Sequence, residues 1–178
     1  MAELRIVVDH QKIEYEGPFD LKDLVTMIQR FMFERGFDRK LEKDFESDTK
    51  TGKEVEWQVA NWKKVSDYAK YIFRIRMLVH DYVKVDAEKD KKKVKVGSGR
   101  IIIFFDGLLE LDYFHKWDSR PFLVFLRSLY DKFIFKFYTE RFEQRLTYDM
   151  THLINEVEKI FNLHRHYRVV KITSDHAH

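Results

Sequence analysis

The sequence has no cysteine, only two prolines and only six glycines. Without cysteine the chain can form no disulfide and no thiolate zinc or iron–sulfur centre, and this composition is typical of a reducing compartment. No stretch approaches the ~20 consecutive apolar residues that a membrane span needs. Glu3 also stands where a secretory signal peptide would be basic. These absences predict a cytoplasmic protein without a membrane span.

Aromatic and charged residues are abundant instead. Sixteen Phe, nine Tyr and three Trp supply enough apolar area for a folded core, and a length of 178 residues suits a single domain. The 33 basic and 30 acidic residues leave a net charge of +3. This weak excess permits contact with nucleic acid without arguing for it.

The N-terminal part of the chain predicts a strand followed by a helix. Residues 4–15 are rich in β-branched and alternating side chains, and Gly17-Pro18 is expected to end the strand. Asp20 is a good N-cap for a helix over 20–35, in which apolar residues recur every three or four positions.

Two hairpins are expected next. Alternation over 37–46 and 55–59 predicts a first hairpin with a half-exposed edge strand. Residues 68–85 and 100–114 predict two longer strands, each with one wholly apolar face and one mixed face. The charged segment 86–93 is expected to be the loop tip between them.

The C-terminal part lacks glycine and proline from residue 122 onward. An apolar stripe predicts a long helix to about residue 163, either unbroken or divided in two near 139–151. Residues 164–178 are expected to form a polar, flexible tail that contains one β-like run, 169–172.

Together these elements predict an α+β fold in one domain, residues 1–163. An antiparallel sheet of five to six strands packs against one short N-terminal helix and one long C-terminal helix. This element order resembles the helix-grip architecture of the polyketide-cyclase and lipid-transfer type, which implies a curved sheet around a long helix and an apolar cavity.

The mixed sheet face is the main candidate for an interface, because apolar patches rimmed by charge are typical of protein interfaces. Its candidate residues are Trp62, Ile72, Arg74, Arg76, Leu78, Tyr82, Phe104, Leu108 and Phe114. The acidic residues Asp106, Glu110 and Asp112 fall on the same face. We expect them to form cross-strand ion pairs rather than an acid–base pair.

Two further kinds of site are open. The candidates for lining an apolar cavity between sheet and helix are Tyr71, Phe73, Phe105, Tyr113 and Phe133. The candidates for contact with nucleic-acid phosphates are Lys89, Lys91, Lys92, Lys93, Lys95, Arg165, Arg168 and Lys171.

Catalytic and metal signals are weak. His164 and His166 could share a metal, but no carboxylate cluster accompanies them. The run Gly97-Ser98-Gly99 precedes a strand rather than a helix, so a turn is expected there and not a phosphate cradle. No catalytic residue and no cofactor is expected.

The sequence therefore favours a non-enzymatic interaction or scaffold module that self-associates or joins a larger assembly through its mixed sheet face and long aromatic helix. One alternative is a carrier of an apolar small molecule in a sheet–helix cavity. The other is an RNA- or ribosome-associated basic protein.

Overall fold

The computed structural model describes residues 3–66, 69–89, 92–111, 136–164 and 168–172, and within these ranges it describes only the backbone at 3, 41, 87–89, 92–94, 136–139, 163–164 and 168–172. The elements in chain order are β1 (Glu3–Phe19), α1 (Leu21–Glu34), β2 (Asp38–Asp48), β3 (Lys53–Lys64), β4 (Ala69–Lys89), β5 (Lys92–Leu111), α3 (Lys136–His164) and β6 (Arg168–Ile172). The predicted α+β class is confirmed.

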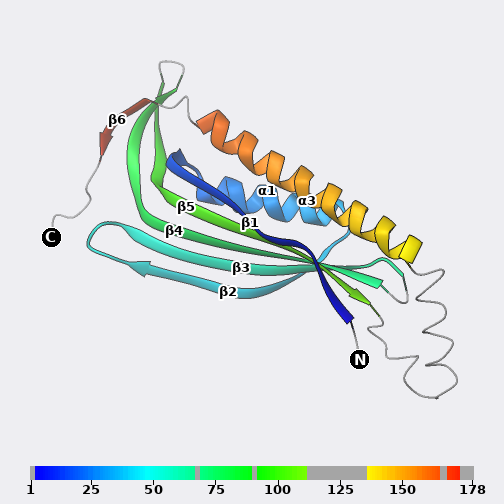
Figure 1. Ribbon diagram of the computed structural model, residues 1–178. Helices are drawn as coiled ribbons and strands as arrows, with labels where there is room; N and C mark the ends of the chain where they lie inside the picture. Colours follow the sequence, from blue (N-terminus) through cyan, green and yellow to red (C-terminus); the bar gives the residue numbers. More distant parts are fainter. Residues whose placement is uncertain (1–2, 67–68, 90–91, 112–135, 165–167, 173–178) are drawn as a thin grey trace, which may run out of the picture.

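The strands form one antiparallel sheet in the order β1-β5-β4-β3-β2, and β6 pairs with the far end of β4. Strands β1 and β2 are therefore the two edges of this five-strand path. The sheet is long and curved, and both helices lie on the same side of it (Figure 1). We call the side that carries the helices the inner face and the opposite side the outer face.

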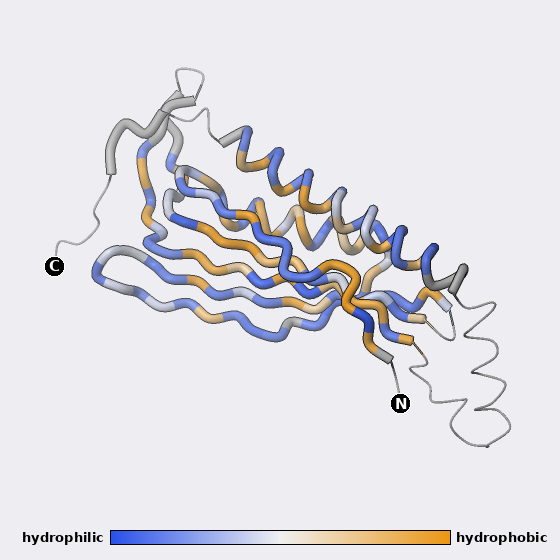
Figure 2. The backbone as a smooth tube through the Cα atoms, viewed as in Figure 1, coloured by the Kyte–Doolittle hydropathy of each residue, from blue (hydrophilic) through white to orange (hydrophobic). Residues whose placement is uncertain are grey.

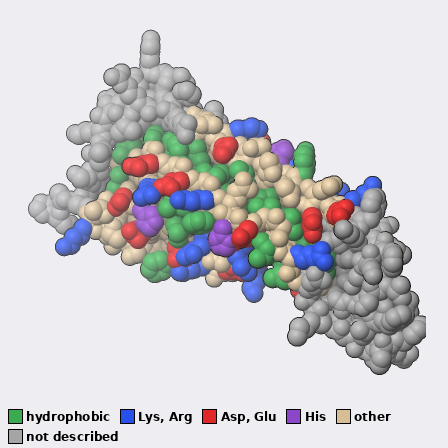
Figure 3. Space-filling model, in the orientation of Figure 1, with side chains coloured by type: hydrophobic (Ala, Val, Ile, Leu, Met, Phe, Trp, Pro, Cys, Tyr) green, Lys and Arg blue, Asp and Glu red, His purple; other side chains and the backbone are tan. Residues whose placement is uncertain are grey.

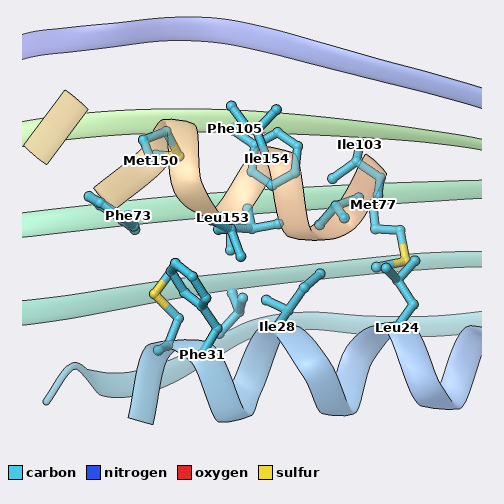
Figure 4. Close-up of a cluster of buried hydrophobic side chains, with 14 of the residues drawn as sticks. Leu24, Ile28, Phe31, Phe73, Met77, Ile103, Phe105, Met150, Leu153 and Ile154 are labelled. Atoms are coloured by element: carbon cyan, nitrogen blue, oxygen red, sulfur yellow. The ribbon is translucent and has the colours of Figure 1, made fainter. Parts of the chain in front are cut away.

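The core lies between the inner face and the two helices. Odd-numbered residues of β4 from Tyr71 to Val79, and of β5 from Ile101 to Leu111, are buried there. Leu24, Ile28 and Phe31 of α1 meet Met150, Leu153 and Ile154 of α3 above these strands (Figure 4). Along α3 the apolar residues recur with helical spacing (Figure 2), which confirms the predicted stripe from Phe142 to Val157.

Close packing of α3 depends on a glycine in β5. A Cβ atom on Gly107 would lie 2.6 Å from Leu146 Cδ2 and 3.4 Å from Met150 Cε. A side chain here would require Leu146 to move, so glycine lets the helix lie close to the sheet without that adjustment.

The helix predicted over 20–35 is confirmed, because α1 begins after an Asp20 N-cap. The Asp20 carboxylate accepts hydrogen bonds from the backbone N–H groups of Lys22 and Asp23, at 2.9 and 3.1 Å. At the other end Gly36 adopts φ +72°, and this left-handed residue lets the chain turn into β2.

Three boundaries differ from the sequence prediction. Strand β1 runs through Gly17-Pro18 to Phe19, which is possible because an edge strand tolerates the missing N–H of proline. Strand β4 continues to Lys89, and strand β5 begins at Lys92. Residues 86–89 therefore belong to a strand rather than to a loop tip.

Gly97-Ser98-Gly99 lies inside β5 and is not a turn. Its first glycine makes room for an aromatic ring, because a Cβ atom on Gly97 would lie 2.0 Å from the ring of Tyr82. The glycines of this segment therefore serve packing between β4 and β5.

The C-terminal part contains one described helix and one strand, and the strand places residues 168–172 in the sheet rather than in a tail. From Lys136 to His164 the chain is a single helix, and the β-like run in the expected tail forms β6, paired antiparallel with β4. The aromatic segment 122–135 lies outside the described residues. Neither described helix combines the length and the apolar character that crossing a membrane would require.

Candidate functional site

The outer face of the sheet carries rows of side chains that follow the strand register. Ile6 of β1 is paired with Leu108, Leu108 with Ile72, and Ile72 with Trp62. These four residues form an apolar row across β1, β5, β4 and β3, which we call the Ile6–Trp62 row. Leu108, Ile72 and Trp62 of this row are predicted interface residues. Ile6 was not predicted from the sequence.

Charged residues form ion pairs on the outer face beside this row. On the side of the molecule seen in Figure 3, Lys, Arg, Asp and Glu side chains are interspersed with hydrophobic ones. The pairs are Arg76–Glu56 at 2.9 Å, Arg74–Glu42 at 3.8 Å, Lys70–Glu110 at 2.5 Å, His80–Glu54 at 3.5 Å, Lys12–Glu14 at 2.7 Å, and the close contacts Lys43–Glu56 and Arg100–Glu14.

Two acids of the outer face, Glu56 and Glu14, have a lowered pKa because of these pairs. The hydrogen bond from Lys43, together with Arg76, holds the pKa of Glu56 below its usual range. Hydrogen bonds from Lys12 and Arg100 do the same for the pKa of Glu14. Glu110 pairs with Lys70, and Asp106 contacts His10. Asp112 lies outside the described residues.

Most of the predicted interface residues lie on the outer face. Phe104, Leu78 and Ile72 are half-buried there, and Leu108 is buried. Phe114 lies outside the described residues.

Tyr82 was predicted on the outer face and lies on the inner one. The β4–β5 register shifts between His80 and Val83, and Asp81 adopts φ 52°. This bulge turns the Tyr82 ring inward, to 5.3 Å from the ring of Phe19. Its burial there raises the pKa of Tyr82.

The first half of β1 is an apolar sheet edge. Leu4 and Ile6 are 56% and 63% exposed, which is unusual for side chains of this size. On the inner side of the same edge, Val7 and α3 line a hollow of about 570 Å³, with Tyr148 on its wall. Tyr148 is itself 67% exposed, so three exposed large apolar side chains surround this edge.

Beyond this edge, β1 bulges at Asp9 and His10. His10 adopts φ 43°, its backbone N–H donates to Asp106 Oδ1 at 2.9 Å, and its ring Nδ1 lies 2.7 Å from Asp9 Oδ1. One ligand atom from each of the three residues lies within 4.8 Å of the others. The hydrogen bond with Asp9 and the charge of Asp106 raise the pKa of His10.

The predicted cavity residues of the described chain lie in the packed core. Tyr71, Phe73 and Phe105 are 2%, 0% and 0% exposed. Burial raises the pKa of Tyr71 to about 12, and its hydroxyl has no hydrogen-bond partner among the described residues. Tyr113 and Phe133 lie outside the described residues.

A groove runs between α1 and the inner side of β2 and β3, and we call it the α1–β2 groove. It consists of two hollows of about 570 and 470 Å³ that share Thr26, Gln29 and Arg39. Buried Phe37 lies in the wall of the first hollow and buried Trp57 in the wall of the second.

The groove also contains the one polar residue that is buried among the described side chains. Asn61 is 2% exposed, it lines the first hollow, and its Nδ2 has no hydrogen-bond partner within the described ranges. It stands opposite Arg39 in the β2–β3 register.

The basic candidates gather at the end of the sheet where β4, β5 and β6 meet. There Asp86 of β4 is paired with Lys95 on one side and Lys171 on the other. Glu88 is paired in the same way with Lys93 and Arg168. Acidic positions thus alternate with basic ones across the three strands.

The remaining members of this set are placed only in part. The backbone of Lys89 ends β4 and that of Lys92 begins β5, whereas Lys91 and Arg165 lie outside the described residues. Of the two histidines considered for a metal, His164 ends α3 and His166 lies outside the described residues.

No protein-family model, curated protein or solved structure matches the chain. Its candidate sites are therefore argued from their own geometry. The β1 edge and the α1–β2 groove were not predicted from the sequence. For the edge, the available signal was the uncharged outward positions of Leu4 and Ile6. For the groove, it was the lone amide of Asn61 within an otherwise apolar alternation.

Proposed function

We propose that this chain is a non-enzymatic interaction module that self-associates, with two copies pairing through the first half of β1. The observation that carries the proposal is the Ile6–Trp62 row, which reaches the edge of the sheet with an exposed apolar residue. An apolar row that ends at an open edge can be continued by an identical row from a second copy.

The two edges of the sheet differ in how they resist pairing. Edge strands are normally protected by charges and bulges, because their free backbone N–H and C=O groups are a template for another strand. Strand β2 has both protections, with a charged sequence and a register shift between Leu41 and Lys43. Strand β1 also has register shifts, after Ile6 and after Val8, but its outward positions at Leu4 and Ile6 carry no charge.

A two-fold axis at Ile6 gives a self-complementary pairing. Antiparallel strands related by this axis set Ile6 against Ile6 of the second copy and Leu4 against Val8. Arg5 then faces Val7 rather than a second Arg5, so no like charges meet between residues 4 and 8 of the two strands, whereas Glu3 faces Asp9 just beyond them. Two Ile6–Trp62 rows become one continuous row on a joined outer face.

The inner side of the edge offers further contact area. Arg5 reaches α3 through its ion pair with Glu143 at 3.7 Å, and the hollow beside Val7 presents the exposed Tyr148. Tyrosine is enriched in protein interfaces because its large ring is rigid and amphipathic. Strand pairing together with these helix contacts supports a specific dimer.

Sedimentation equilibrium of the full chain tests the proposal. We expect a concentration-dependent dimer, and Ile6→Lys should raise its dissociation constant at least tenfold, because lysine on an edge strand opposes pairing. Phe45→Lys is the matched control, since Phe45 is also exposed, at 54%, on the opposite edge strand. A monomer at all concentrations, or equal weakening by Phe45→Lys, would contradict the proposal.

A further inference from the structure

The α1–β2 groove holds a buried hydrogen-bond donor that the described protein does not use. Asn61 Nδ2 is shielded from solvent and lacks a partner within the described ranges, and Asn61 lines the first hollow. Leaving a buried amide unpaired costs folding free energy, and such groups call for an explanation. A ligand that accepts this hydrogen bond would provide one.

Positive charge flanks this donor from both walls of the groove. Arg39 stands directly opposite Asn61 on β2, and residues so paired have Cβ atoms about 5 Å apart. Arg30 lines the same hollow from α1. Asp38 also lines this hollow, but strand alternation directs its side chain toward the outer face, because it is paired with Trp62 rather than with Asn61.

Apolar side chains form the rest of the first hollow. Met32 and Phe37 are buried in its wall, whereas Phe33 is 80% exposed at its rim. An aromatic ring this exposed at the rim of a hollow is available to cover an apolar ligand.

The second hollow continues the apolar track from Arg39 along the inner face. Val55 and Trp57 are buried in its wall and Val25 borders it from α1. Asp20, Asp44 and Glu46 also line this hollow and outnumber its Lys22. Their negative charge disfavours an anion at this end, so the anionic group of a ligand belongs beside Asn61 and Arg39.

We propose that the α1–β2 groove binds an amphiphilic monocarboxylate. The carboxylate accepts hydrogen bonds from Asn61 Nδ2 and Arg39, with Arg30 nearby, and the apolar chain lies along Phe37 or Trp57. This site lies on the inner face and is separate from the β1 edge, so its test is independent of dimer formation.

Isothermal titration of the full chain with decanoate below its micellar concentration tests the site. Decanol and decylammonium are the neutral and the charge-reversed probes. We expect one decanoate per chain, bound at least tenfold more tightly than either comparison probe, because only the anion satisfies Asn61 and Arg39 together. Equal binding of all three probes, or no binding of decanoate, would overturn the proposal.

Variants separate the carboxylate contact from general apolar binding. Arg39→Gln should weaken decanoate at least tenfold and leave decanol unchanged, since Arg39 is exposed and its loss spares the core. Lys40→Gln is the matched control, because it removes the same charge from the adjacent outward position of β2. Equal effects of the two variants would exclude a specific contact with Arg39.

Asn61→Leu tests the buried donor itself. Because leucine removes the unpaired amide and keeps the same branched side-chain skeleton, this variant should melt at a higher temperature while losing at least tenfold in decanoate affinity. A stabilised variant that still prefers decanoate over decanol would show that Asn61 does not hold the carboxylate. If Asn61→Leu lowers the melting temperature, the amide stabilises the fold, and its role as a hydrogen-bond donor to a ligand is excluded.

Discussion

His10 shows how one residue can set a local geometry that its sequence neighbours do not suggest. A non-glycine residue at φ 43° is uncommon, and here it is held by two acidic neighbours. Asp106 fixes its backbone N–H and Asp9 binds its ring. The bulge at this point adds a kink to β1 between its apolar first half and the charged part that follows.

The titration of His10 gives a test of this arrangement. Its pKa in the folded protein should lie above the ordinary value of about 6.5, because the hydrogen bond with Asp9 and the charge of Asp106 favour the imidazolium. His10 therefore contributes stability that is fully present below about pH 6.5 and is lost as the pH rises through the raised pKa. A ¹H–¹⁵N NMR titration of the histidine rings measures this pKa.

Substitution of Asp9 tests which contact raises the pKa of His10. Asp9→Asn should lower the pKa of His10, since it removes the largest favourable contribution. Asp44→Asn removes the same charge on the inner side of β2 and should leave the pKa of His10 unchanged. A wild-type His10 that titrates at or below 6.5 would contradict the observed contacts.

At the scale of elements, α1 depends on its N-cap. The Asp20 carboxylate satisfies two backbone N–H groups that would otherwise lack partners. Asp20→Ala should therefore destabilise the protein by about 1 kcal/mol, within the ~0.5–2 kcal/mol measured for such caps. Urea denaturation monitored by circular dichroism measures the difference.

Asp23→Ala is the control for the charge of Asp20. Asp23 lies in the first turn of α1, where its charge interacts with the helix dipole but caps no backbone group. Removing the Asp23 carboxylate should lower the free energy of unfolding less than removing that of Asp20. Equal costs for the two variants would mean that charge, rather than the capping hydrogen bonds, stabilises the start of α1.

Periodicity predicted the faces of regular strands and failed at bulges. Phe37 and Phe45 share parity in the sequence, yet Phe37 is 6% exposed and Phe45 is 54% exposed. The β2–β3 register shifts between Leu41 and Lys43, and an extra residue reverses the faces that follow it. The same reversal moved Tyr82 inward, because alternation assumes one residue per partner position.

At the scale of the whole molecule, strand order decides which strands are edges. Local patterns gave the strands and helices of this chain, because burial on one face leaves a period in the sequence. They could not show that β1 pairs with β5, with Ile6 beside Leu108. The β1 edge and the α1–β2 groove both arise from such distant pairings, so their residues could be placed only in the folded structure.

Dimer formation through β1 has a consequence for the stability of the whole chain. Association stabilises the folded state by mass action, so the melting temperature of a dimer rises with protein concentration. A tenfold increase corresponds to about 1.4 kcal/mol per dimer, or about 0.7 kcal/mol per chain. For a chain of this size that amounts to roughly 1.5–3 °C.

Calorimetry over a hundredfold range of concentration should therefore show a rise of about 3–6 °C for the wild-type chain. Ile6→Lys should melt at a nearly constant temperature over the same range, while Phe45→Lys should follow the wild type, since it leaves the β1 edge intact. A wild-type melting temperature that does not change with concentration would refute the dimer. A rise that persists in Ile6→Lys would place the interface on a surface other than the β1 edge.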